Sequence, residues 1–308
     1  MWFWFALIAF FCWSGSDLFS KIGCVEKSDK YSHLKMVTAV GVVMGLHAAY
    51  EVFIGGTVIT GEVILKYLPV SALYIVSMAI GYMGLRYIEL SISSPICNSS
   101  GALVAIMTVC ASLIRGQKIE IAPLQFAAVG LVIAGVIGLG IVEAKEDEEL
   151  RALRQDKANY KYAKSAIAII LPLIYCLLDA LGTFADSIVL ETLDEDSANV
   201  AYELTFLICG IASFIYVKLI KKQKYLPKKE APKYIGAIFE TAGQFAYVYA
   251  LADSAHVALS APIISSYCLL SAVWGRIFLK EKLSWKHYLT IAVAIVGIAI
   301  IGFYDEAG

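Results

Sequence analysis

Charged residues are scarce in this chain of 308 amino acids. Asp, Glu, Lys and Arg make up 17% of it and apolar residues 59%, whereas soluble domains have about 25% charged and 45–50% apolar residues. So few charged side chains could not cover the surface of a soluble protein of this size. The net charge of −1 also excludes the basic surface that binding to nucleic acid requires. We therefore predict an integral membrane protein whose surroundings are the lipid bilayer, with no nucleic acid as a partner.

The chain also lacks the motifs of several membrane enzymes and pumps. It contains no DxxD or HExxH motif for metal-assisted chemistry and no GxxxxGK[ST] phosphate-binding loop. Its seven cysteines include no CxxC pair, so neither a zinc site nor a disulfide framework is indicated. We therefore expect no catalytic residues, no metal and no cofactor. The alternative to a transporter is a polytopic membrane enzyme that acts on a lipid-linked or small substrate.

Long apolar runs account for most of the sequence. A helix needs about 20 apolar residues to cross the hydrocarbon core of a bilayer, and ten segments meet this requirement. Ten spans leave about 31 residues for each span with its loop, so no separate soluble domain fits. The predicted spans are Trp2–Gly23, Met36–Ile54, Leu68–Tyr87, Ser91–Ile114, Ile121–Val142, Ser165–Leu190, Ala198–Ile220, Tyr234–Leu251, Val257–Leu279 and Tyr288–Phe303.

Basic residues are concentrated on one side of these spans. The loops after spans 1, 3, 5, 7 and 9, with the adjoining span ends, hold 22 of the 25 Lys and Arg residues, and the opposite side holds only Lys66, Arg115 and Lys118. By the positive-inside rule, the basic side faces the cytoplasm. With an even number of spans, both termini are then outside the cytoplasm, and we expect the protein in the cell membrane.

The two halves of the chain resemble each other. Trp13 and Asp17 in span 1 align with Tyr175 and Asp179 in span 6 at an offset of 162 residues, and glycines of spans 5 and 10 align at the same offset. Because each half has five spans, the halves must lie in opposite orientations across the membrane. The predicted fold is all-α, with ten transmembrane helices as two inverted five-helix repeats, residues 1–142 and 165–308, joined by a charged cytoplasmic linker, residues 143–164.

Spans 4 and 9 carry the most specific pattern. Both open with a polar stretch that contains proline, SISSPICNSSG and VALSAPIISSY, and span 9 is followed by KEKL at 280–283 and a glycine-spaced final helix. Over about residues 3–303 the chain resembles the drug/metabolite transporter superfamily, specifically its EamA-type members. This resemblance implies ten helices, transport by alternating access, and small metabolites or organic ions as substrates.

Several acidic residues lie within predicted spans, where an ionisable group is costly and therefore indicates a function. Asp17 and Asp179 each follow an aromatic residue by one helical turn, and Glu240 begins a polar stripe in span 8. These acids have no obvious Lys or Arg partner within the membrane. Such a carboxylate takes up a proton or binds a cation, and the sequence leaves both alternatives open.

Segment 93–101, SSPICNSSG, is the most polar stretch within any span, which favours a cavity-lining position over contact with lipid. We expect a secondary active transporter of a small metabolite or an organic cation, working as a monomer or a homodimer, with proton coupling as a mechanism that the acids allow. The residues predicted to bind the substrate are Trp13, Asp17, Tyr82, Asn98, Ser99, Tyr175, Asp179, Tyr202, Glu203, Glu240, Gln244 and Tyr267.

Overall fold

The computed structural model describes residues 1–24, 29–87, 96–116, 121–145, 167–278 and 283–307, and all regular structure in these ranges is helical. The first half contains α1 (Trp2–Cys24), α2 (Ser32–Tyr50) with its π-helical extension η1 (Glu51–Gly55), α3 (Gly61–Tyr87), α5 (Ser100–Ile114) and α6 (Pro123–Ala144). The second half contains α8 (Ile167–Val189), α9 (Glu195–Phe214) with its extension η2 (Ile215–Ile220), α10 (Pro227–Leu251), α11 (Val257–Ser265), α12 (Tyr267–Phe278) and α13 (Trp285–Ala307).

Ten membrane crossings can be traced in the described chain. Eight are long and apolar enough to span a bilayer by length and composition alone, with η1 and η2 extending their helices and α11 and α12 together forming one crossing. Helix α5, with 15 residues, is the described part of span 4. Helix α10 has 25 residues, and its polar residues, including Glu240 and Gln244, lower its mean hydropathy. The predicted all-helical membrane fold is therefore confirmed.

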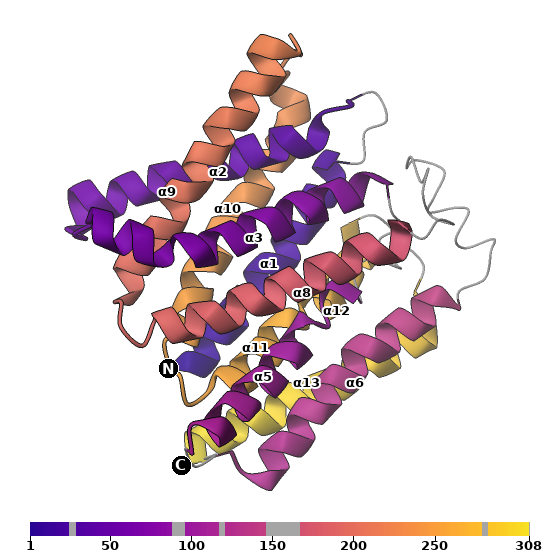
Figure 1. Ribbon diagram of the computed structural model, residues 1–308. Helices are drawn as coiled ribbons and strands as arrows, with labels where there is room; N and C mark the ends of the chain where they lie inside the picture. The colour runs from indigo at the N-terminus through magenta and orange to yellow at the C-terminus, as the bar shows by residue number, and fades with distance from the viewer. Residues whose placement is uncertain (25–28, 88–95, 117–120, 146–166, 279–282, 308) are drawn as a thin grey trace.

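The helix pairs follow the internal repeat. Helix α1 packs along α10, and their counterparts in the other half, α8 and α3, also pack together. Three further pairs, α2 with α9, α5 with α11 and α6 with α13, each join a helix to its own counterpart (Figure 1). A two-fold axis that exchanges the halves produces this pattern of contacts. The division of the chain at 142 and 165 remains a prediction, because residues 146–166 lie outside the described ranges.

Spans 4 and 9 are interrupted inside the bundle. Ser266 separates α11 from α12, and a turn at Asn98 and Ser99 precedes α5. In span 9, the side chain of Ser266 donates a hydrogen bond to the carbonyl of Ile263 at 2.6 Å and so occupies a backbone acceptor near the break. The sequence did not predict the interruption at Ser266. Discontinuous helices at the level of the binding site are a feature of transporters with inverted repeats.

Both chain termini lie at one end of the bundle, the terminal end. The end of α6 and the start of α8, which flank the linker, lie at the opposite end, the linker end (Figure 1). Ten crossings put both termini on the same side, and the odd number of five in each half puts the linker on the opposite side. The 22 basic residues assign the linker end to the cytoplasm, and this orientation stays a prediction.

The orientation can be tested with single cysteines in a variant that lacks the seven native cysteines. Thr192→Cys lies between α8 and α9 at the terminal end, and Lys221→Cys lies between η2 and α10 at the linker end. In intact cells, we expect an impermeant thiol reagent to label the first cysteine, and to label the second only after permeabilisation. Labelling in the reverse order would overturn the orientation.

Candidate functional site

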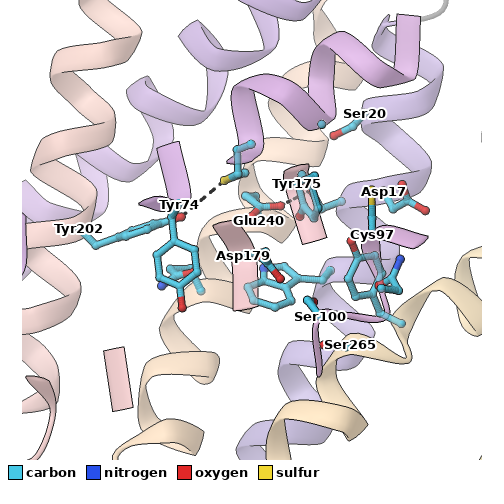
Figure 2. A pocket seen from close by; sticks show the side chains of 17 residues that line it. Asp17, Ser20, Tyr74, Cys97, Ser100, Tyr175, Asp179, Tyr202, Glu240 and Ser265 are labelled. Atoms are coloured by element: carbon cyan, nitrogen blue, oxygen red, sulfur yellow. Dashed lines mark hydrogen bonds between the residues drawn. The ribbon is translucent and has the colours of Figure 1, made fainter. Parts of the chain in front are cut away.

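A cavity of about 120 Å³ lies between the two halves of the bundle. Its walls come from α1, α3, α5, α8, α9, α10 and the segments around the two helix interruptions (Figure 2). Ser20 and Gly81 extend it toward the linker ends of α1 and α3. The lining residues are Trp13, Ser16, Asp17, Ser20, Tyr74, Met78, Gly81, Cys97, Asn98, Ser100, Tyr175, Asp179, Tyr202, Glu240, Gln244, Ser265 and Tyr267.

Three carboxylates lie in the cavity wall, and no Lys, Arg or His is among the described lining residues. Glu240 is 9% exposed and accepts a hydrogen bond of 2.7 Å from the hydroxyl of Ser16. Asp179 accepts a hydrogen bond from Ser100, the first residue of α5. The N-terminus of α5 therefore faces a negative group, which is the favourable orientation of a helix dipole. Asp17 and Asp179 both lie close enough to Glu240 for their charges to interact with it.

Five aromatic side chains form much of the remaining wall. The indole of Trp13 lies 4.8 Å from the ring of Tyr247 and 6.1 Å from that of Tyr267, measured between ring centroids. Tyr202 meets Tyr74 edge to face at 5.8 Å. Glycine at position 243 lets Trp13 lie against the backbone of α10, because any Cβ there would overlap the indole ring. The aromatic residues of the wall are Trp13, Tyr74, Tyr175, Tyr202 and Tyr267.

Two buried hydrogen-bond donors of the wall have no partner among the described residues. These are the indole Nε1 of Trp13 and the amide Nε2 of Gln244, and Gln244 is only 1% exposed. A buried donor without an acceptor costs about 1–3 kcal/mol. A ligand that carries an acceptor oxygen would remove this cost.

A layer of hydrogen-bonded side chains closes the cavity toward the terminal end. Asp186 of α8 is fully buried and accepts hydrogen bonds from the hydroxyls of Tyr67 at 2.9 Å and Tyr74 at 3.4 Å. The hydroxyl of Tyr247 lies 2.5 Å from that of Tyr74 and donates to Thr183 at 2.6 Å. We call these five side chains, from α3, α8 and α10, the terminal-end layer.

Nine of the twelve residues predicted to bind substrate line this cavity. Ser99 lies beside it, in a smaller cavity against α6. Glu203 points away from it, because successive residues of a helix face different directions and Tyr202 is the one that faces the cavity. Tyr82 belongs to α3, but its side chain lies outside the described part of the structure.

Other lining residues were not predicted as site residues. Ser16 and Ser100 are next to the predicted residues Asp17 and Ser99 in the sequence, and this proximity could have identified them as site residues. Met78 and Gly81 carry no polar group, and nothing in an apolar segment distinguishes a residue that faces a cavity from one that faces lipid. Their positions follow from the packing of α3 against α8, where the ring of Tyr175 lies against Gly81.

Comparison with known proteins agrees with this fold. Residues 166–303 match the EamA-like transporter family. This match confirms the resemblance to EamA-type transporters and covers α8 to α13. A search of curated proteins finds no match. A crystal structure of another protein superposes with a TM-score of 0.64 and 11% identity, over 98% of this chain and 96% of that one, so the likeness in fold includes both halves.

Proposed function

We propose that the protein is a secondary transporter that moves a small organic cation across the cell membrane by alternating access, with the linker end in the cytoplasm. The EamA-like match supports membrane transport. The observation that carries the choice of substrate is the cavity wall, in which three carboxylates and five aromatic rings face a common space without a basic side chain among the described residues.

Electrostatics favours a cation in this cavity. Three carboxylates close together repel one another, and a monovalent cation between them reduces that repulsion while losing its own hydration. Aromatic faces within about 6 Å attract a desolvated cation by about 0.5–2 kcal/mol. The unpaired donors of Trp13 and Gln244 favour a substrate with a hydroxyl or carbonyl oxygen near the charged group.

The fold supports alternating access. The terminal-end layer separates the cavity from the terminal end, whereas Ser20 and Gly81 extend the cavity toward the linker end. With the proposed orientation, this is a conformation closed to the outside. Transport then requires the layer to open while the linker end closes.

A pair of probes with the same shape tests the choice of a cation. Choline carries a quaternary ammonium and a hydroxyl, and 3,3-dimethylbutan-1-ol is its uncharged isostere. In calorimetric titrations of the purified protein, we expect choline to bind at least about tenfold more tightly, a difference of about 1.4 kcal/mol. Equal affinities would contradict a cation-selective cavity, and conversion of choline into a product would favour the membrane enzyme.

A further inference from the structure

A second group of ionisable side chains lies outside the cavity, between α2 and α9. The imidazole Nδ1 of His47 is 2.8 Å from Oε1 of Glu203, and its Nε2 is 3.7 Å from Oε1 of Glu51. Glu51 begins η1, at the terminal end of α2, whereas Glu203 lies two turns inside α9. The three side chains therefore lead from the terminal end of the bundle into its interior.

The inner end of this group is shielded from solvent. Glu203 is 0% exposed, and its second oxygen, Oε2, is buried with no hydrogen-bond partner in the described part of the chain. The side chains of His47 and Glu51 are 30% and 17% exposed, so exposure is lowest at the inner end. Helices α2 and α9 are also in backbone contact one to two turns away, where Gly41 lies against Gly210.

The neighbouring helices supply few other charges. The ring of Phe245 on α10 meets His47 edge to face at 5.6 Å. The hydroxyls of α3 lie toward Tyr202, which faces a different direction from Glu203 on α9. Among the described residues, the other titratable groups nearby are Tyr50 on α2 and Tyr249 on α10. Tyr249 interacts with Glu51 and with Asp196 and Glu195 at the start of α9.

The geometry suits a proton better than a metal ion. The two imidazole nitrogens point in opposite directions, so no single ion could contact both carboxylates and the ring at once. The described residues accordingly contain no group of three side chains arranged to hold a metal. A proton has no such restriction, because an imidazole can accept it at one nitrogen and release another from the second.

We propose that Glu51, His47 and Glu203 form a proton-binding relay that loads Glu203 from the terminal end. A proton delivered by Glu51 or by water binds Nε2 of His47 and forms the imidazolium. The imidazolium then passes its Nδ1 proton to Oε1 of Glu203. The products are a neutral imidazole and a neutral carboxylic acid, and one proton has moved inward without any other reactant.

Glu203 is well placed to influence the cavity. It adjoins Tyr202, whose ring lies in the cavity wall and contacts Tyr74 of the terminal-end layer. Proton transfer to Glu203 replaces its charged hydrogen bond with His47 by a weaker, neutral one, which loosens the contact between α9 and α2 and lets α9 move together with Tyr202. This coupling role rests on the proposed transport function, whereas proton binding by Glu203 does not.

Infrared difference spectra of the reconstituted protein, recorded without substrate, test proton binding. On a jump to acidic pH we expect a carboxylic-acid C=O band that is present in the wild type and absent from Glu203→Gln. His47→Gln keeps Glu203 but breaks the relay, so the same band should appear more slowly. His256→Gln, which alters the separate pair of His256 with Asp253 at the terminal end, is the matched control and should keep both the band and its rate of appearance. Equal bands in wild type and Glu203→Gln would overturn the proposal.

Flux of radiolabelled choline in proteoliposomes tests the coupling. In Glu203→Gln and His47→Gln we expect choline exchange at equal pH to persist while net flux driven by a pH gradient is lost. Persistent pH-driven flux in both variants would overturn the coupling role. If wild-type protein does not move choline, the substrate proposal fails, and the infrared experiment still decides whether Glu203 binds a proton.

Discussion

Asp179→Asn, Asp17→Asn and Glu240→Gln are each expected to weaken choline binding by about 1–3 kcal/mol, a factor of about 5–150. Each substitution removes a negative charge from the cavity wall and changes the side-chain shape little. Because the charge interacts with the cation and not with an uncharged ligand of the same shape, affinity for 3,3-dimethylbutan-1-ol should not fall. Titration of both ligands against each variant gives the measurement.

The matched control is Asp253→Asn, which removes an exposed carboxylate paired with His256 outside the cavity. We expect it to bind both ligands as the wild type does. If all three cavity variants keep wild-type affinity for choline, the carboxylates have a structural role and the substrate site lies elsewhere. A parallel loss of affinity for both ligands would indicate a change in the shape of the cavity instead of its charge.

The membrane fold could be predicted from composition and spacing. Apolar runs of about 20 residues have few alternatives to a membrane-spanning helix, since a bilayer leaves backbone groups no other hydrogen-bond partners. The offset of 162 residues that aligns Asp17 with Asp179 also predicted which helices are counterparts, but it did not predict that α2 would pack against α9 or α6 against α13. Helix α10 is harder to recognise as a span, because its charged and amide side chains lower its mean hydropathy. It fits a membrane span once its polar stripe is interpreted as a face that lines a cavity.

The cavity was predictable only where polarity marked it. Asp17, Asn98 and Glu240 stand out because lipid cannot accommodate them, and they line the cavity together. Glu203 is equally polar, but it lies against His47 and outside the cavity. An acidic residue within a span therefore marks either a cavity or a buried partner, and the sequence does not distinguish the two. Its neighbour Tyr202 faces the cavity, because adjacent residues of a helix point in different directions. A pattern of polar residues does not show which of the two faces the cavity.

The terminal-end layer shows a further limit of sequence patterns. Tyr67 and Tyr74 lie seven residues apart on α3, and either would be typical of an interfacial aromatic belt. Both hydroxyls reach Asp186 because α3 packs along α8, a contact between residues more than 100 positions apart. No local pattern in the sequence encodes that contact. The position of the layer between the cavity and the terminal end could therefore be seen only in the three-dimensional structure.

Asp186→Leu should open the cavity toward the terminal end. The substitution leaves the hydroxyl of Tyr67 without its acceptor and removes the carboxylate partner of Tyr74, and a hydrogen bond to a charged group contributes about 1.5–3 kcal/mol. The conformation that is open at the terminal end does not make these hydrogen bonds. Their loss therefore destabilises only the conformation that is closed there. A loss of about 3 kcal/mol would raise the population of the open state by roughly 100-fold, as long as that state is minor in the wild type.

Met78→Cys, in the variant without native cysteines, reports this opening, because Met78 lies in the cavity beyond the layer. In intact cells, an impermeant thiol reagent should label this cysteine much faster when Asp186→Leu is also present. Asp186→Asn keeps one acceptor oxygen and the side-chain shape, so its effect should be smaller, and Glu191→Gln, a change at an exposed acid of the terminal end, should have none. Unchanged labelling in a folded Asp186→Leu protein would show that packing of the helices, and not the hydrogen bonds of the layer, keeps the terminal end closed.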